Sequence, residues 1–229
     1  GYAGRTDWRL PHFRELINVS SFDLVGGWVD NILFPGAASV NRWSSSLILP
    51  AATSALSVNG QMSSTTIGTA RTTRCVSGGG FPAPDWKDNG DGTVLDNRSG
   101  LYYQKCSNGQ ANDTSCSGTL GTVTWQNALI YCNNLTLAGR KWRLPNVNEL
   151  VGLIDLTRTA TPYINPTYFP GVPADGANQY YFWASTTNVP NILYANLLDF
   201  SNLSIASMDT KNNAANGAFQ YVARCVSGP

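Results

Sequence analysis

Lys141-Trp142-Arg143-Leu144-Pro145-Asn146-Val147-Asn148-Glu149-Leu150 is the stretch from which the organisation of the chain follows, because it occurs twice. Its partner is Asp7-Trp8-Arg9-Leu10-Pro11-His12-Phe13-Arg14-Glu15-Leu16. Trp-Arg-Leu-Pro recurs in the same order, and Glu-Leu follows the proline at the same distance. An internal repeat has to be established first, since a missed repeat misassigns the whole fold.

The repeated stretch predicts the end of a strand followed by a short helix. Pro145 stops the strand, and Asn146 can cap the helix, with Glu149 three residues later to complete a capping box. The apolar residues that follow recur at helical spacing and form one face. They are Val147, Leu150, Val151 and Ile154.

Three further anchors recur in the same order along the chain. Pair by pair they are Phe34-Pro35-Gly36 with Phe169-Pro170-Gly171, Arg42-Trp43-Ser44-Ser45-Ser46 with Phe182-Trp183-Ala184-Ser185-Thr186, and Arg74-Cys75-Val76-Ser77-Gly78 with Arg224-Cys225-Val226-Ser227-Gly228. The first copy is shorter, mostly in its loops. Four anchors in one order indicate a duplication rather than chance.

The duplication predicts a division of the 229-residue chain, which length alone does not settle. Residues 1–78 correspond to the second half of a domain whose first half is missing. Residues 79–86 are a linker by their Gly and Pro content, and residues 87–229 form a whole domain.

Turn residues and apolar patterns predict the elements of residues 87–229. Asn-Gly and Asp-Gly turns indicate a hairpin over 87–103, and Thr124 is the N-cap of a helix that continues to Cys132. Residues 155–180 form a connection rich in Pro, Gly and Asn. The predicted strands then cover residues 181–185, 193–198, 203–206 and 219–225. Together with the abundant Gly, Asn, Ser and Thr, this indicates a loop-rich α+β protein.

The five cysteines favour disulfides in an oxidising compartment, since none lies in a C-x-x-C pair and His12 is the single histidine. Cys106 and Cys116 flank a polar loop and are expected to pair locally. Cys132 and Cys225 would close a loop of about 94 residues, a constraint of roughly 4–5 kcal/mol. Cys75 is then either a free thiol or paired outside this sequence.

Charge and composition exclude several classes of protein. With 15 basic and 14 acidic residues, the chain has no electrostatic footprint for nucleic acid or an anionic membrane. It has no apolar run long enough to span a membrane. Gly1-Tyr2-Ala3-Gly4 does not resemble a signal peptide, so an export signal would lie outside this sequence. Residues 87–229 hold no histidine, phosphate loop or metal triad, and we do not expect an enzyme.

One candidate metal site is the carboxylate cluster Asp88, Asp91 and Asp96, whose short spacing resembles a calcium loop. It lacks the downstream glutamate of an EF-hand. The competing interpretation is a hairpin in which Asp and Asn serve turn geometry, and we favour it. No cofactor is therefore expected, with calcium kept as a hypothesis.

One candidate ligand-binding surface combines flat aromatic rings with short amides, a mixture that suits sugar faces and hydroxyl groups. Its residues are Trp183, Asn188, Asn191, Tyr194, Asn196, Asp199 and Asn202. The competing interpretation is that Trp183, which recurs as Trp43, belongs to the core. The asparagines would then be solvated turn residues.

A set of motifs in residues 87–229 resembles the DUF1566 family, also known as the C-terminal domain of the Legionella collagen-like adhesin. The set comprises Asp88-Asn89-Gly90-Asp91-Gly92-Thr93-Val94, Thr124-Trp125-Gln126, Tyr131-Cys132, Trp142-Arg143-Leu144-Pro145, Glu149-Leu150, Trp183 and Arg224-Cys225-Val226. The resemblance implies a C-type-lectin-like fold, in which two short helices pack on small twisted antiparallel sheets. It also implies an exported bacterial protein, outside the cell or on its surface. Some members bind sulfated polysaccharide.

Two functional hypotheses follow. The first is a non-enzymatic, adhesin-like module that binds carbohydrate or another surface ligand. The alternative is a structural subunit of an extracellular filament or array, in which a neighbouring chain completes the incomplete first repeat. Such head-to-tail self-association would use an exposed sheet edge, since an unpaired edge invites strand addition.

Overall fold

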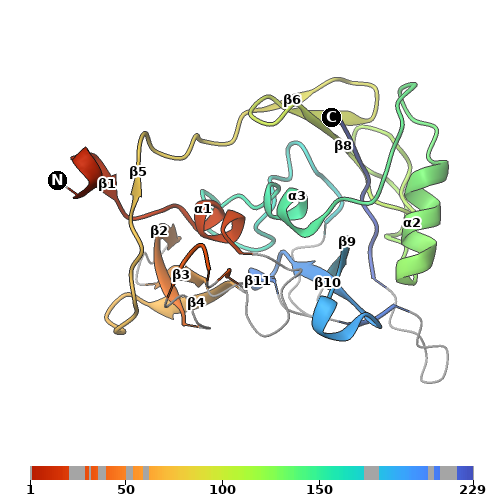
Figure 1. The fold of residues 1–229 in the computed structure, drawn as a ribbon. Coiled ribbons are helices and arrows are strands. Elements are labelled where there is room, and N and C mark those ends of the chain that lie inside the picture. Colours follow the sequence, from red (N-terminus) through yellow and green to blue (C-terminus); the bar gives the residue numbers. More distant parts are fainter. Residues whose placement is uncertain are drawn as a thin grey trace.

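A computed structural model describes residues 2–20, 29–30, 32–35, 40–49, 54–58, 62–172, 181–205, 209–211 and 221–228. The predicted α+β class is confirmed, because short helices combine with several small antiparallel sheets and two disulfides. In Figure 1 the first part of the chain lies on the left, and helix α2 forms the right-hand side.

The described residues of the second part of the chain form two sheets. The first has the order β13-β8-β7-β6, and its members are β6 (Trp86–Asp88), β7 (Thr93–Asp96), β8 (Leu101–Gln104) and β13 (Val226–Ser227). The hairpin predicted over residues 87–103 is thereby confirmed. The second sheet is centred on β10, and its members are β9 (Tyr181–Thr187), β10 (Tyr194–Asp199), β11 (Ser204–Ile205) and β12 (Asp209–Thr210).

The predicted final strand over residues 219–225 is wrong in its bounds. Tyr221 and Val222 make only isolated bridges, and the paired strand β13 begins at Val226. Residues 219 and 220 lie outside the described part of the chain. The apolar pattern on which this strand was predicted runs through a segment whose backbone bonds to several different partners rather than to one neighbouring strand.

Among the described residues of the second part, three helices lie between these sheets or beside them. They are α2 (Trp125–Asn134), α3 (Val147–Val151) and the 3-10 turn η2 (Val189–Asn191). The Thr124 hydroxyl accepts a hydrogen bond from the Asn127 amide, so the predicted N-cap of α2 is confirmed.

The first part of the chain repeats this arrangement on a smaller scale. Its helical elements are η1 (Tyr2–Gly4) and α1 (Phe13–Asn18), and its strands are β1 (Trp8–Arg9), β2 (Arg42–Ile48), β3 (Ser54–Val58), β4 (Met62–Thr66) and β5 (Val76–Ser77). Strands β2, β3 and β4 form one antiparallel sheet, and β1 pairs with β5. Helix α1 packs on β2 and β3 as α3 packs on β9 and β10.

Both recurring stretches form the same capped helix start. The Asn146 side chain accepts from the backbone of Glu149, whose carboxylate accepts in return from the Asn146 amide. Helix α1 has the same capping box, with His12 as its N-cap. Each glutamate also receives two hydrogen bonds from the arginine six residues before it, at 2.7 Å in α1 and 2.6–2.7 Å in α3.

The other anchors also occupy corresponding places. The Ser45 amide donates to the Pro11 carbonyl at 2.8 Å, and the Ser185 amide donates to the Pro145 carbonyl at the same distance. The recurring arginines stack on the recurring phenylalanines: the guanidinium carbon lies 4.9 Å from the ring centre in Arg74–Phe34 and 5.0 Å in Arg224–Phe169. Residues that match between the two parts in sequence therefore also make matching contacts.

One hydrophobic core joins the two parts of the chain. It contains Phe13, Leu16 and Ile17 of α1 together with apolar residues of α3, β9 and β10. The buried Arg14 side chain reinforces this junction, because its guanidinium donates to the Val151, Gly152 and Ile154 carbonyls at the C-terminal end of α3. A cation at this end also interacts favourably with the helix dipole.

His12 makes the capping of α1 dependent on pH. Its Nδ1 accepts from the Arg14 amide at 3.3 Å, which only a neutral imidazole can do, and its ring stacks on Phe81. Burial, reinforced by the positive charge of Arg14, lowers the pKa of His12 to about 4.

We expect acidification from pH 7 to 4 to destabilise the protein in part through His12. Below about pH 6.5 the unfolded chain binds a proton that the folded chain takes up only near pH 4, so the free energy of unfolding falls across this window. The His12→Asn variant carries at position 12 the residue type that caps α3. Its free energy of unfolding should fall less steeply with pH than that of the unaltered protein. Urea unfolding of both proteins at pH 7 and 4.5 measures the difference, and equal pH slopes would contradict the assignment.

Candidate ligand-binding surface at the β9–β10 hairpin

The β9–β10 hairpin stands on a buried base. The two strands are antiparallel, with Leu198 opposite Phe182 and Ala195 opposite Thr187. Phe182, Trp183 and Ala184 of β9 have no exposed surface, and neither have Leu197 and Leu198 of β10. The hairpin end, which contains η2, is therefore presented on a rigid support.

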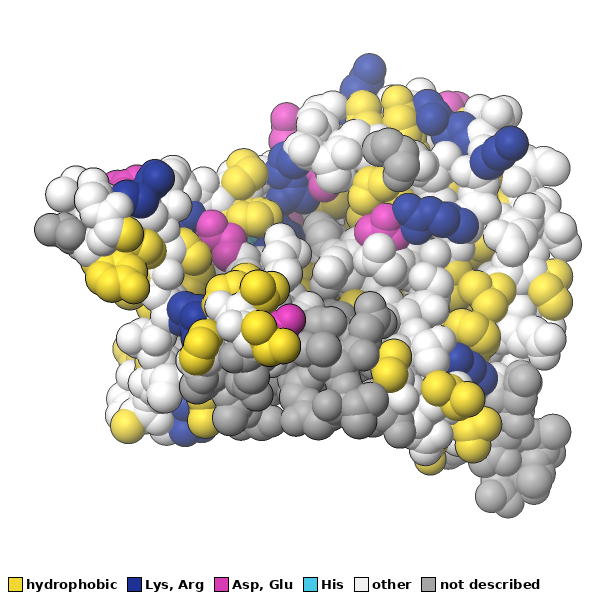
Figure 2. Space-filling view, in the orientation of Figure 1, with side chains coloured by type: hydrophobic (Ala, Val, Ile, Leu, Met, Phe, Trp, Pro, Cys, Tyr) yellow, Lys and Arg dark blue, Asp and Glu magenta, His cyan; other side chains and the backbone are white. Residues whose placement is uncertain are grey.

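The end of the hairpin exposes two large apolar side chains. Ile192 is 69% exposed and Leu193 is 66% exposed, and the exposed Asn191 precedes them. Figure 2 shows hydrophobic side chains next to a basic one at the lower right of the molecule, in the region of this hairpin. Adjacent exposed apolar side chains bordered by polar groups are typical of an interaction surface.

A cation and an aromatic ring lie next to this hairpin end. The Lys211 amide, just after β12, donates to the Leu193 carbonyl at 2.8 Å, and its Nζ donates to the Thr187 hydroxyl at 2.7 Å. The same Nζ lies 4.4 Å from the centre of the Trp125 ring, a cation–π contact. Partial burial lowers the pKa of Lys211.

Trp125 is fixed at the start of α2, because its indole N–H donates to the Ala184 carbonyl at 2.8 Å. The ring is half-buried, and its face is turned to the Lys211 ammonium. The surface thus combines apolar side chains, a fixed indole and an ammonium group, a mixture that suits a polar ligand with flat apolar faces.

The structure brings together some of the predicted ligand residues and separates others. Asn191 and Tyr194 lie at the hairpin end, where the neighbouring Asn188 is buried, and Asn202 is exposed in the turn after β10. Asn196 and Asp199 are buried in β10, where the Asp199 carboxylate accepts from the Ser201 amide and hydroxyl at 2.7 Å. These last two do not reach the surface.

Trp183 is fully buried, as the core interpretation of this residue requires. Its indole N–H donates to the Val123 carbonyl at 2.8 Å, and its ring meets the Tyr221 ring edge-to-face with the centres 5.0 Å apart. It packs in a second core cluster under α2, together with the Cys132–Cys225 disulfide and Trp142. It therefore supports the hairpin and does not itself line the surface.

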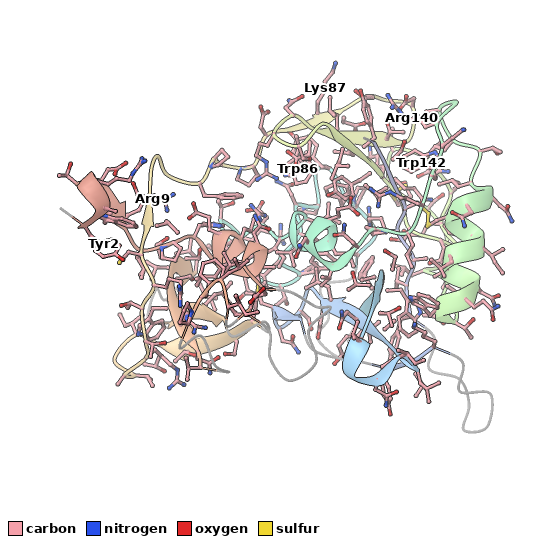
Figure 3. All side chains as sticks on the ribbon, viewed as in Figure 1. Tyr2, Arg9, Trp86, Lys87, Arg140 and Trp142 are labelled. Atoms are coloured by element: carbon pink, nitrogen blue, oxygen red, sulfur yellow. A yellow bond between two sulfur atoms is a disulfide. The ribbon has the colours of Figure 1, made fainter. Side chains whose placement is uncertain are left out.

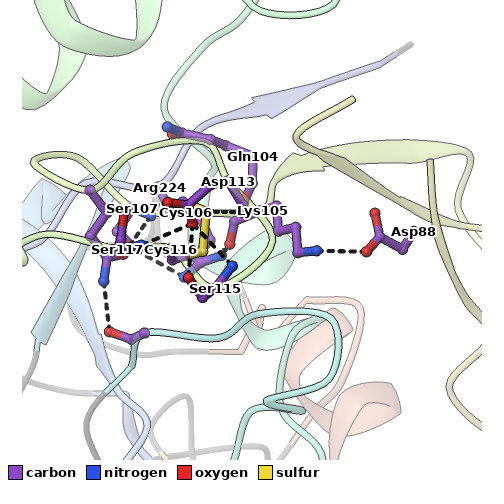
Figure 4. Close-up of a disulfide and its surroundings, with 12 residues drawn as sticks. Asp88, Gln104, Lys105, Cys106, Ser107, Asp113, Ser115, Cys116, Ser117 and Arg224 are labelled. Carbon is purple, nitrogen blue, oxygen red and sulfur yellow. Dashed lines mark hydrogen bonds and ion pairs between the residues drawn. A yellow bond between two sulfur atoms is a disulfide. The ribbon is translucent and has the colours of Figure 1, made fainter. Parts of the chain in front are cut away.

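The three carboxylates considered for calcium do not converge. Asp88 accepts from the Lys105 ammonium at 2.7 Å, an ion pair visible in Figure 4, and Asp91 accepts from Thr93. Asp96 is buried in a bidentate pair with Arg98. Across the described residues no group of three or more acidic, His or Cys side chains is placed to hold a metal ion. These hydrogen bonds match the turn interpretation.

Comparison with protein families places these features in a known group. The family model described as the Lcl C-terminal domain matches residues 92–227, more than half of the chain. The chain belongs to the Lcl C-terminal domain family. No curated protein and no solved structure matches it. The Lcl match agrees with the resemblance to the C-terminal domain of the Legionella collagen-like protein, which is a surface-associated family. It covers one stretch of the chain, so the DUF1566 name and the second, partial copy stay predictions.

The Lcl match covers the hairpin, Trp125 and Lys211, so the candidate surface lies within the family domain. No helix among the described residues is both long enough and apolar enough to cross a membrane. Both disulfides, Cys106–Cys116 and Cys132–Cys225, also lie in the Lcl domain and pair as the sequence suggested.

The Cys106–Cys116 loop is closed by polar contacts, drawn in Figure 4. Asp113 accepts hydrogen bonds from Ser115 and Ser117, which lower the pKa of its carboxyl to about 2. The buried Arg224 guanidinium donates to the Gln104 and Lys105 carbonyls and the Ser107 hydroxyl. These contacts hold the loop in place within the Lcl domain.

Sequence reasoning missed Trp125, Ile192, Leu193 and Lys211. Trp125 falls at the start of the helix predicted after Thr124, Ile192 comes just before the strand predicted over 193–198, and Leu193 is its first residue. The one available signal was the Pro190-Asn191 pair, a turn signal that puts the following apolar pair at an exposed hairpin end.

Proposed function

We propose that this chain is an exported, non-enzymatic module of a bacterial surface adhesin that binds carbohydrate through the end of the β9–β10 hairpin. The observation that carries the proposal is the exposed Ile192–Leu193 pair beside an ammonium group and a fixed tryptophan. Membership of an adhesin-like family supports the same conclusion.

The charge of the surface favours a glycan with anionic substituents. Lys211 keeps a positive charge next to the exposed apolar pair, and hydrogen bonds to a charged group are stronger than neutral ones. The exposed amide of Asn191 adds a donor and an acceptor for sugar hydroxyls. Ile192 and Leu193 would cover the apolar face of a sugar ring.

The test is a glycan array followed by affinity measurements on the bound glycan. We expect Lys211→Ala and the double variant Ile192→Ser/Leu193→Ser each to weaken binding by about tenfold or more, the loss of roughly 1.4 kcal/mol. Because Ile192 and Leu193 are exposed, the double variant should keep its thermal stability.

Lys87→Ala is the matched control, since Lys87 is also a lysine of the second part of the chain but is exposed on β6 in the other sheet. Figure 3 shows Lys87 at the top of the molecule, away from β9 and β10. The proposal fails if no glycan binds selectively. It also fails if Lys87→Ala and Lys211→Ala lose affinity equally.

A further inference from the structure

Corresponding residues of the two parts of the chain differ sharply in exposure. Trp142 is 4% exposed, and Trp183 and Cys225 have no exposed surface. Their counterparts Trp8 and Cys75 are exposed, at 38% for Trp8, and the counterpart Trp43 is half-buried. We call the surface formed by Trp8, Leu10, Trp43 and Cys75, with the adjoining edge of β5, the open face.

Backbone pairing brings the residues of the open face together. Arg9 lies opposite Val76 in the β1–β5 pair, which places Trp8 and Leu10 next to the strand that follows Cys75. The Trp43 amide donates to the Thr72 carbonyl, which brings β2 to the same segment. The second part has the same arrangement, since Arg143 bridges Val226 and the Trp183 amide donates to the Val222 carbonyl.

In the second part, a strand and a helix cover the equivalent surface. Ala128 and Cys132 of α2 are fully buried against Trp142, Leu144 and Trp183, and Cys132 is bonded to Cys225. Strand β8 pairs with β13, the counterpart of β5, and places Tyr103 opposite Val226. In Figure 3, Trp142 lies beside α2, whereas Tyr2 and Arg9 lie at the opposite edge of the molecule.

Among the described elements only η1 touches the open face, where the Tyr2 ring meets Trp8 edge-to-face and the Tyr2 carbonyl accepts from the Trp8 indole. Trp8 stays 38% exposed and Cys75 stays exposed, and within the described ranges β5 pairs only with β1. The chain's own strand–helix segment is not free to do so, because the Cys132–Cys225 bond holds α2 on the second part. The cover therefore has to come from residues other than those described.

We propose that the open face binds a segment of a neighbouring subunit that presents a β-strand followed by a cysteine-bearing helix. The strand pairs with the free edge of β5, and the apolar face of the helix packs on Trp8 and Trp43. The helix cysteine then forms a disulfide with Cys75. Two thiols are oxidised to one disulfide, and a small-molecule disulfide takes up the two electrons and two protons and is reduced to two thiols.

This inference concerns assembly and goes beyond ligand binding by the β9–β10 hairpin. What specifies the partner is the internal comparison, because the second part shows which chemistry covers this surface. The partner needs a small residue facing the tryptophans, as Ala128 does, and a cysteine four residues later. The open face offers a sheet edge for the partner's strand, an apolar surface for its helix and a thiol for its cysteine.

The experiment uses the 229-residue chain and, as a probe, a polypeptide of its residues 86–137 in which Cys132 is the one free thiol. In a glutathione redox buffer we expect a Cys75–Cys132 adduct, identified by peptide mass spectrometry. A probe with Ala128→Glu, which alters the packed face of the helix, should form this adduct at about one tenth of the rate or below. An Ile130→Glu probe is the matched control, because Ile130 is 50% exposed, and it should react like the unaltered probe.

Two variants of the chain keep the test independent of how each probe folds. Trp8→Ala, at an exposed position, should slow adduct formation about tenfold, and Cys75→Ser should abolish it. Equal rates for all probes and for Trp8→Ala would overturn the proposal, as would an adduct at Cys225. In thiol-blocked native material, Cys75 should be found in a disulfide between chains, and a free Cys75 or an intrachain bond would overturn the neighbouring-subunit source.

Discussion

Replacing Cys132 and Cys225 together by serine is expected to lower the free energy of unfolding by about 4–5 kcal/mol. The bond joins α2 to the segment before β13 across a sequence separation of 93 residues, so it removes much of the conformational freedom of the unfolded chain. Both sulfurs are also fully buried among Trp142, Trp183 and Leu197. Urea unfolding of the oxidised protein and the double variant measures the difference.

The second disulfide provides the matched control for this prediction. Cys106 and Cys116 are separated by 10 residues, and the shorter loop implies a smaller loss of about 3 kcal/mol for Cys106→Ser/Cys116→Ser. If the short-loop variant were the less stable of the two, loop closure would not be the dominant contribution. The direct strain or packing of each bond would then have to be measured separately.

Trp183→Ala should cost about 3–5 kcal/mol of stability, as large-to-small replacements in a core do. The indole has no exposed surface, and the substitution leaves a cavity under α2 and removes one of the two hydrogen bonds that the Val123 carbonyl accepts, the other coming from the Tyr221 amide. Thermal unfolding of the variant gives the size of the effect. Any loss of ligand affinity should then follow from the loss of folded protein.

Trp43→Ala tests the same residue type at the corresponding position of the first part. Because Trp43 is only half-buried, we expect a smaller loss of about 1–2 kcal/mol. If the Trp183→Ala protein kept its stability but no longer bound ligand, Trp183 would belong to the binding surface after all. Equal losses in the two variants would mean that α2 contributes little to the burial of Trp183.

Several local features could be predicted because short-range chemistry fixes them. The capping box of α3 depends on residues three apart, and the hairpin of β6 and β7 depends on its Asn-Gly and Asp-Gly turns. The final strand was misplaced because residues 221–225 bond to separate neighbours, which an alternating apolar pattern does not reveal.

The candidate surface could be predicted only in part. Its asparagines and Tyr194 come from one continuous segment, whereas Trp125 and Lys211 belong to α2 and the residue after β12. These segments meet because the Trp125 indole bonds to Ala184 and the Lys211 amide bonds to Leu193. In contrast, the pairing of Asp88 with Lys105 and of Asp96 with Arg98 separates carboxylates that are close in sequence.

By itself, the sequence determined the recurring motifs, the capping box of α3 and the Cys106–Cys116 pair, because these depend on short spacings or on correspondence between copies, and it also predicted the Cys132–Cys225 pair. Only the tertiary structure decided which copy of each recurring residue is buried. Trp8 and Trp142 stand in the same motif, yet α2 and its disulfide cover just one of them. Burial depends on what packs over a residue, and that partner lies far away in the chain.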